Sequence, residues 1–569
     1  MSEKENSKRV LFTLAYPLIG TGSGTAVKTV MHAMRDEGYK VGVLCADNKT
    51  DYPKEDDIEY ATVPFTAPTE NPEIIPGQAK NNYIMFTSHP AGATHNYWNA
   101  SLDEVVEYVN IFKKHLHEEV ERFNPDIIHA QHNWLLSSEV ARIDKPMVLT
   151  IHGTDLMGYT KSQEIYDDTV KQLGEIPQSN LKIAGTEIVH RSGSLEEMAK
   201  KLDKLEEMHP DEESKKLIDL FREYARNKFY IQEAQNSAKG ADQVIVISEA
   251  QKAEFARLFP YAADKVSLLE NGYDPKVFYV DGRYTAQEIF EQLHSNLTED
   301  GKISPEYDDL ILFVGKFADF KGIDSLLIAN KRYDEKLKAQ GKKPLTIIVG
   351  NGDLDEKLKQ EAKDLGLTNT HFVGRQGHDI VRPLQNLATV SLIPSRDEPF
   401  GLVVIEGTAC GHPVIGSNSG GIPDILNTDK QELPEDDIIR TKLGLLIKPL
   451  PKGPEGLTKE QVENLNSIAY TYVDGSPEQR KIVMEGLIKR LGISEESLKT
   501  YFDNYEQSTN ALAEGVVGIV NKEYAFDNQE IADYTLDKFS QEVINKKTEE
   551  IYRKAEESRE EKRKAQDRE

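Results

Sequence analysis

The residues best suited to chemistry stand where an apolar run gives way to a helical pattern. The string S-R-D-E-P-F-G-L-V-V-I-E extends from Ser395 to Glu406. Glu398 falls in the expected turn, and Glu406 falls about one and a half turns into the expected helix. After Pro399, which has no N–H, the backbone N–H groups of Phe400, Gly401 and Leu402 would be free at the helix N-terminus, where the helix dipole favours an anion. The string predicts an anion site with a carboxylate on each side to accept hydrogen bonds from hydroxyls.

This string resembles the retaining glycosyltransferases of family 4, which share the GT-B fold with glycogen synthases. Three further segments also match the sequence pattern of that family, namely Gly407–Val414, Gly420–Asp424 and Asn271–Asp274 with Phe278. The resemblance covers most of residues 9–157 and 240–430.

The resemblance implies roles for the residues of the string. Glu398 would lie against the donor sugar, and Glu406 would bind the ribose hydroxyls. The N–H groups of one turn would hold the sugar and the distal phosphate; that turn consists of Phe400, Gly401, Leu402 and Val403.

A basic pair in the loop Gly315–Gly322 is a second feature of the family. Lys316 and Lys321 would neutralise a diphosphate leaving group as charge develops on it. The family usually has arginine at the first position, so Lys316 is a departure. Lysine is a point charge and cannot grip a phosphate through two parallel hydrogen bonds as arginine does.

Three other segments are candidates for contacts with the donor. The resemblance implies that His152, at the end of a predicted strand, faces a cleft and acts on the donor sugar. It also implies that the loop of Arg375 holds the base. The glycine-rich stretch from Gly20 to Thr25 opens a helical pattern, and there the N–H groups of Gly22 and Gly24 could approach a phosphate.

No metal site and no cofactor are predicted. His129 and His132 lie close in sequence, but no third or fourth ligand stands at a suitable spacing. An Asp-x-Asp motif on a suitable loop is also missing from the sequence, which disfavours a metal-dependent transferase of the other common fold.

Alternating apolar runs and helical patterns indicate how these residues are positioned. Strands are expected at 9–14, 41–45, 125–131, 146–152 and 243–248. A second series follows at 310–314, 346–349, 370–373, 390–394 and 413–417. Two such series predict two doubly wound α/β domains in tandem. With the resemblance, the expected architecture is GT-B, two facing Rossmann-like domains.

The expected first domain covers residues 1–275, with a helical insertion at about 158–238, and is completed by a crossing helix at 536–569. Within its insertion, Ser194 and Glu197 form a predicted capping box. The expected second domain covers residues 276–535 and contains a polar, helical insertion at about 452–535. The tail from Tyr534 is predicted to be one long helix.

Composition excludes several classes of function. The chain has 569 residues and a formal charge of −27, which argues against binding through nucleic-acid phosphates or to anionic lipid. Cys45 and Cys410 are its two cysteines, too few for a disulfide framework. Neither a signal peptide nor a membrane-spanning run is evident. A cytoplasmic protein without stable membrane association is expected.

The sequence therefore predicts a metal-independent, retaining transfer of a hexosyl group from a nucleoside diphosphate sugar, with a UDP-sugar favoured. The acceptor would be a soluble or polar carbohydrate, glycoconjugate or small molecule, and a homo-oligomer is possible. Two alternatives stay open: a nucleotide-sugar epimerase of the same fold, and a non-catalytic nucleotide-sugar-binding partner protein.

Overall fold

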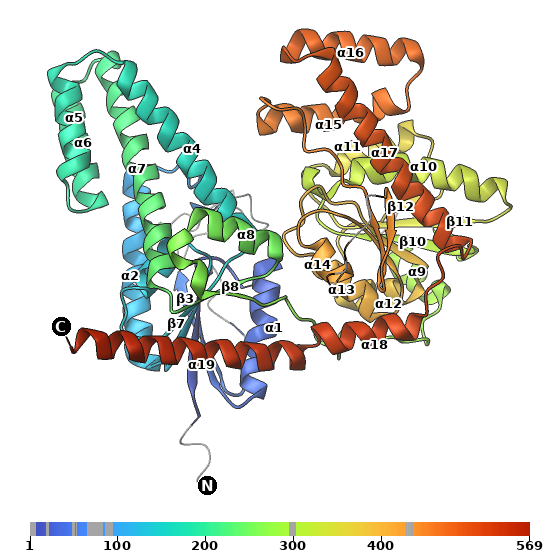
Figure 1. The fold of residues 1–569 in the computed structure, drawn as a ribbon, viewed down its shortest axis with the longest axis horizontal. Coiled ribbons are helices and arrows are strands. Elements are labelled where there is room, and N and C mark those ends of the chain that lie inside the picture. Colours follow the sequence, from blue (N-terminus) through green and yellow to red (C-terminus); the bar gives the residue numbers. More distant parts are fainter. Residues whose placement is uncertain are drawn as a thin grey trace. The chain divides into compact units, whose positions relative to one another are not determined.

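The computed structural model describes residues 7–568 apart from 19–21, 48–51, 53, 65–83, 86–94, 295–302, 428–429, 431 and 433–435. The chain divides into two compact units. The first consists of Met1–Glu270 and Ile544–Glu569, and the second of Asn271–Val543. In the described residues, each unit contains a seven-stranded sheet with helices packed on it (Figure 1).

The sheet of the first unit is parallel throughout and has the strand order β3-β2-β1-β6-β7-β8-β9. Its strands are β1 (Arg9–Leu14), β2 (Lys40–Asp47), β3 (Ile58–Pro64), β6 (Ile127–Gln131), β7 (Met147–Thr150), β8 (Gln243–Val246) and β9 (Val266–Leu268). A separate pair consists of β4 (Ile84–Met85) and β5 (His95–Asn96).

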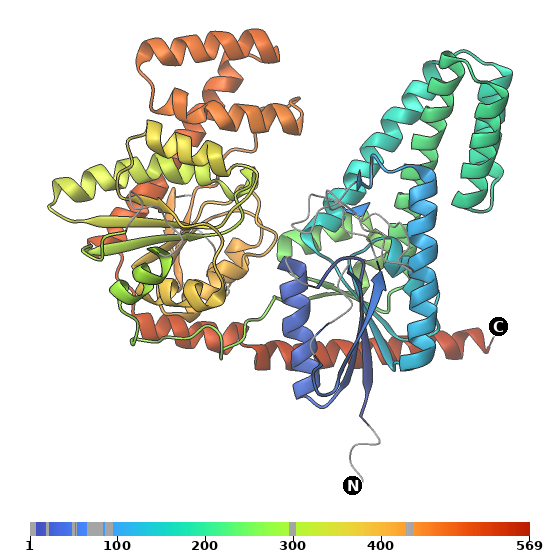
Figure 2. The same ribbon diagram turned by 180° about the vertical axis from the view of Figure 1, so that it is seen from behind.

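Side-chain alternation on β1 divides the core of this unit in two. Leu11 packs on one face with α2, whereas Val10 and Phe12 pack on the other with α1 and α19. Figures 1 and 2 show α1 and α2 on opposite faces of the sheet. The helices outside the insertion are α1 (Gly22–Asp36), α2 (Leu102–Phe123), α3 (Leu135–Val140), α8 (Glu249–Leu258), the 3₁₀ turn η2 (Pro260–Lys265) and α19 (Gln541–Gln566).

The predicted helical insertion of the first unit is present and contains four helices. They are α4 (Gly153–Glu175), α5 (Asn180–Arg191), α6 (Leu195–Met208) and α7 (Glu212–Gly240). Ser194 caps α6 as predicted, by accepting a hydrogen bond from Glu197 N. The reciprocal half of the capping box is different, because the Glu197 carboxylate accepts from Gly193 N instead of Ser194 N.

The sheet of the second unit has the strand order β12-β11-β10-β13-β14-β16-β15, and its last pair is antiparallel. Its strands are β10 (Asp309–Val314), β11 (Pro344–Val349), β12 (Thr370–Phe372), β13 (Val390–Ile393), β14 (Val414–Ser417), β15 (Ile438–Arg440) and β16 (Gly444–Ile447). The five strands predicted here from apolar runs are all present. The pair β15 and β16 was not predicted.

Side-chain caps start the three helices of the second insertion. Thr458, Ser476 and Ser494 each accept a hydrogen bond from the first turn of the helix that follows. The helices and 3₁₀ turn of the unit are α9 (Ala286–His294), η4 (Asp319–Lys321), α10 (Ile323–Ala339), α11 (Asp355–Asp364), α12 (His378–Leu387), α13 (Leu402–Ala409), α14 (Ile422–Leu426), α15 (Lys459–Val473), α16 (Pro477–Leu491), α17 (Glu495–Val520) and α18 (Asn528–Phe539).

The tail is not the single helix predicted from Tyr534. It consists of α18 and α19, and Ser540 between them has extended backbone and forms a bridge with Tyr273. Among the described helices, none has an apolar stretch long enough to cross a membrane.

Helix α19 belongs to the first unit and packs on its sheet through apolar and polar contacts. The Tyr552 hydroxyl lies 2.8 Å from His129 Nδ1, and both side chains are buried. Arg559 and Lys562 donate to opposite oxygens of the buried Asp242 carboxylate, at 2.9 and 2.6 Å. These contacts join residues 544–569 to β6 and to Asp242, directly before β8, both more than 300 residues earlier in the chain.

Replacement of Tyr552 by alanine should lower the free energy of unfolding of the first unit by about 3–5 kcal/mol, because it leaves a cavity and removes the partner of His129 Nδ1. The two tryptophans, Trp98 and Trp134, both lie in this unit, so their fluorescence during urea unfolding reports its transition alone. The exposed Lys554→Ala is the matched control on the same helix. An equal midpoint for the Tyr552→Ala and Lys554→Ala variants would contradict the prediction.

Candidate active site

Two loops at the carboxyl end of the second sheet bring an ammonium and a carboxylate together. Lys321 lies in the turn after β10, and Glu398 lies in the loop after β13. Lys321 Nζ is 2.5 Å from Glu398 Oε2, and Ser395 Oγ donates to the same oxygen at 3.1 Å. Both partners are largely buried. The structure thus pairs two of the predicted site residues, which are 77 positions apart in sequence.

The close approach of these loops requires glycine at position 322. Gly322 has a φ of +65°, and a Cβ atom there would lie 2.1 Å from the carbonyl oxygen of Pro394. A side chain would therefore strain the backbone and separate the two loops. Gly322 also ends the 3₁₀ turn that carries Lys321 and directly precedes α10.

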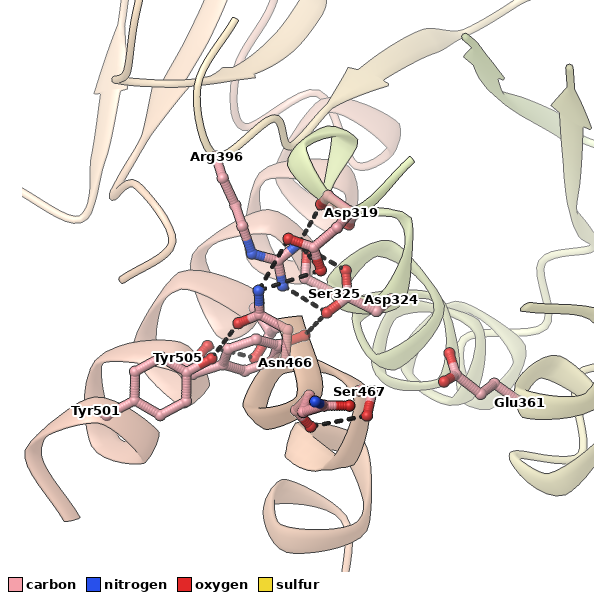
Figure 3. Close-up of polar contacts among 12 residues, drawn as sticks. Asp319, Asp324, Ser325, Glu361, Arg396, Asn466, Ser467, Tyr501 and Tyr505 are labelled. Carbon is pink, nitrogen blue, oxygen red and sulfur yellow. Dashed lines mark hydrogen bonds and ion pairs between the residues drawn. The ribbon is translucent and has the colours of Figure 1, made fainter. Parts of the chain in front are cut away.

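Figure 3 shows a buried polar cluster around Arg396, which lies on the same loop as Glu398. The Arg396 guanidinium bonds Asp324 through both of its terminal nitrogens, at 3.0 and 2.5 Å. It also donates to the carbonyl oxygen of Asp319 at 2.5 Å. Despite burial, the guanidinium holds the pKa of Asp324 below its usual value, so this pair is ionised at neutral pH. For Asp319, in contrast, burial outweighs the effect of the same guanidinium and raises the pKa of the carboxyl.

Helix α13 presents free N–H groups next to Glu398. Its N-cap, Gly401, has a φ of +102°, and Phe400 before it is buried. The N–H groups of Gly401, Leu402 and Val403 bond no acceptor in the described part of the chain. The loop after β14 approaches here too, because Gly421 N donates to Glu398 O at 2.7 Å. This geometry suits an oxyanion of a ligand.

Glu406 lies on the same helix, one turn further along. Its carboxylate is partly buried and has no hydrogen bond or ion pair within residues that the structure describes. Burial raises its pKa to about 7. An unpaired carboxylate in such a place is free to accept hydrogen bonds from hydroxyls of a ligand.

Lys316 and Arg375 are exposed, in contrast to Lys321. Neither side chain has a hydrogen-bond or ion-pair partner among residues 303–427, which are described without a gap. The loop of Arg375 is held by backbone contacts instead, since Gly350 N donates to Gly374 O at 2.9 Å. The structure therefore leaves both cations available to a ligand and does not join them to the Lys321–Glu398 pair.

In the first unit, His152 is the N-cap of α4 and is 6% exposed. Its Nε2 lies 3.0 Å from Gln131 Oε1, and its N–H donates to the Asp155 carboxylate at 2.8 Å. Burial and the neighbouring His132 lower the pKa of His152 to about 3, so the imidazole is neutral at physiological pH. In this unit, then, His152 is a buried, hydrogen-bonded group.

His132 is a feature that the sequence did not single out, except as half of a rejected metal pair. Its Nδ1 lies 2.7 Å from Asp155 Oδ1, and its Nε2 is buried without a partner. Its φ of +70° is unusual for a residue other than glycine. Burial alone would raise the pKa of Asp155, but His132 holds it below the usual value.

The remaining residues that the sequence analysis named are His129 and the glycines at 20, 22 and 24. His129 bonds Tyr552 and Thr150 and belongs to the core. No group of three His, Cys, Asp or Glu side chains in the described residues could hold a metal ion. Gly22 and Gly24 lie in the first turn of α1 instead of a loop before it, and Gly20 falls outside the described residues.

Comparisons with known proteins find glycosyltransferase matches in both units. Residues 20–175 match the family model "Glycosyltransferase Family 4", and residues 298–436 match "Glycosyl transferases group 1". The fold is similar to that of sucrose-phosphate synthase from Thermosynechococcus elongatus, with a TM-score of 0.50, 16% identity and coverage of 96% and 98% of the two chains. The chain has the GT-B glycosyltransferase fold.

Two more proteins share this fold or part of its sequence. One is the catalytic domain of starch synthase IV from Arabidopsis thaliana, bound to ADP and acarbose. The TM-score is 0.52 at 12% identity, and the alignment covers 97% of this chain and 100% of that domain. An uncharacterised glycosyltransferase of Methanocaldococcus jannaschii is 32% identical over 185 residues, which are 32% of this chain and 44% of the relative. The GT-B chain thus spans less than half the length of that relative.

The pH dependence of stability in the GT-B chain should report on Glu406. Its pKa rises from about 4.5 in the unfolded chain to about 7 in the folded one. The folded state therefore binds more protons between these values, and stability falls as pH rises from about 4.5 to 7. Glu406→Gln removes this loss and should stabilise the second unit by at most about 3 kcal/mol at pH 8.

Scanning calorimetry at pH 4.5 and pH 8 measures this difference, and tryptophan fluorescence identifies the transition of the first unit so that the other can be assigned. The Glu406→Gln and wild-type proteins should unfold alike at pH 4.5. A variant that is no more stable than wild type at pH 8 would show that the carboxylate is not desolvated.

Proposed function

We propose that this chain transfers a hexosyl group, with retention of anomeric configuration, from a nucleoside diphosphate sugar to a soluble or polar acceptor. The observation that carries the proposal is the Lys321–Glu398 pair beside the free N–H groups of α13. A fixed cation and helix-terminal amides stabilise a diphosphate, and a neighbouring carboxylate accepts hydrogen bonds from sugar hydroxyls. The family matches of both units support the proposal.

Each group in the second unit would have a distinct role. Lys321, with the exposed Lys316, would neutralise the two phosphates, and the N–H groups of Phe400–Val403 would bind the distal one. Glu398 would receive sugar hydroxyls, and Glu406 would receive the ribose hydroxyls. Arg375 would lie near the base. For His152, Gly22 and Gly24 of the first unit, the contacts with the donor that the resemblance implies stay predictions.

In the proposed reaction the bond between C1 and the diphosphate oxygen breaks, and its electron pair leaves with the nucleoside diphosphate. The acceptor hydroxyl attacks C1 on the same face. Its proton passes to the departing phosphate oxygen, so the protein supplies no covalent intermediate. The nearby ammonium and amides stabilise the leaving group as its charge develops.

The family matches disfavour the epimerase and the non-catalytic partner protein, since both models describe transferases. A thermal-shift screen with UDP, ADP and GDP should identify the base, because a bound ligand raises stability by RT ln(1 + [L]/Kd). UDP is the donor nucleotide that we favour.

Lys321→Met should lower kcat by roughly 10²–10³, because it removes a positive charge from the leaving-group site while keeping most of the side-chain volume. Lys452→Ala is the matched control, since Lys452 is an exposed lysine of the same unit. Initial rates of nucleoside diphosphate release with acceptor present measure the effect. Activity within threefold of wild type, in a variant with an unchanged melting temperature, would rule out the role of Lys321.

Transfer should persist in excess EDTA, because lysine side chains and helix-terminal amides can supply the positive charge that a divalent ion supplies elsewhere. The measurement is the rate of product formation before and after chelation. Loss of activity that Mg²⁺ or Mn²⁺ restores would overturn the metal-independent mechanism.

A further inference from the structure

The second insertion contacts the turn that carries Lys321. Helices α15 and α17 contribute three polar side chains to the buried cluster, namely Asn466, Tyr501 and Tyr505 (Figure 3). The contacts of the insertion reach two aspartates, one on each side of Lys321 in the chain.

The first of these contacts is made through Asp319. Asn466 Nδ2 donates to both oxygens of the Asp319 carboxylate, at 3.1 and 3.0 Å. The amide is held in this orientation because the Tyr501 hydroxyl donates to Asn466 Oδ1. Since Asp319 opens the 3₁₀ turn that ends at Lys321, the orientation of the turn depends on α15 and α17.

The second contact is made through Asp324. The Tyr505 hydroxyl donates to Asp324 Oδ2 at 2.6 Å, and the same oxygen accepts from Arg396. Burial raises the pKa of Tyr505, so its hydroxyl stays protonated and remains a donor. Tyr505 therefore helps to fix the carboxylate to which the guanidinium is bound.

Arg396 connects the cluster to both members of the Lys321–Glu398 pair. Its guanidinium and its N–H bind successive carbonyl oxygens of the turn, those of Asp319 and Phe320, at 2.5 and 2.7 Å. In the other direction, Arg396 lies two residues before Glu398 on the same loop. The separation of the ammonium from the carboxylate thus depends on one side chain that the insertion helps to hold.

We propose that the α15–α17 segment is a positioning element for the donor phosphates, with Tyr501 and Tyr505 as its positioning residues. Their hydroxyls hold Asn466 and Asp324, which hold the turn of Lys321 and the side chain of Arg396. The ammonium is thereby placed where a distal phosphate would bind. This inference rests on the proposed function, because it assigns that phosphate to Lys321.

The proposal predicts an effect on phosphate recognition that loss of stability alone would not produce. A nucleoside monophosphate lacks the distal phosphate, whereas a nucleoside diphosphate has it. The ratio of the two dissociation constants therefore measures the contribution of the Lys321 region, and any general loss of folded protein cancels from the ratio.

The experiment uses the full chain and the double variant Tyr501→Phe/Tyr505→Phe, which removes two hydroxyls and keeps both rings. UDP and UMP are titrated by calorimetry, or the corresponding pair of the base that the thermal-shift screen selects. The double variant should weaken UDP binding about tenfold and leave UMP binding within twofold. Tyr472→Phe is the matched control, since Tyr472 lies on α15 and stacks on Phe502 at 4.0 Å; it should change neither constant.

Lys321→Met separates this inference from the proposed function. If Lys321→Met lowers the preference for UDP over UMP and the double variant does not, the positioning role is wrong and the proposed function stands. If Lys321→Met leaves the preference unchanged, or neither nucleotide binds, the assignment of the distal phosphate is wrong and the positioning role is wrong with it. Should the double variant fail to fold, Tyr505→Phe alone makes the same comparison.

Discussion

The second unit depends on the buried ion pair between Arg396 and Asp324. Removing either partner would leave an unpaired charge in the interior, which costs about 3–5 kcal/mol in buried pairs. The two residues belong to separate βα units, and their contact holds the loop after β13 against the start of α10. The glycine at 322 and the pairing of Lys321 with Glu398 both require that these segments stay close.

The candidate active site of the second unit and the stability of that unit are therefore supported by the same contacts. Four side chains with little access to water form two ion pairs here, Lys321 with Glu398 and Arg396 with Asp324. Glu406 is the exception, because its carboxylate is unpaired and its pKa is raised to about 7. An unpaired, partly buried carboxylate destabilises the folded protein and is available to a ligand. Groups with such shifted pKa values are common at functional sites.

Much of the fold followed from apolar periodicity, because the strands of parallel sheets are buried on both faces and read as continuous apolar runs. The string from Ser395 to Glu406 likewise predicted a turn followed by a helix. The cluster around Arg396 could not be predicted, since Tyr505 meets Asp324 across 181 positions and nothing local marks either residue. The same holds for His132, whose left-handed backbone conformation depends on tertiary packing.

The return of α19 to the first unit has a consequence for the order in which the protein forms during synthesis. Residues 271–543 are all made before residues 544–569, which complete the first unit. The first unit is thus completed after the second. Val10, Phe12 and His129 lack their partners on α19 until that helix has been translated. A chain that lacks residues 544–569 would expose the apolar face on which α19 packs, and such a face is open to chaperones.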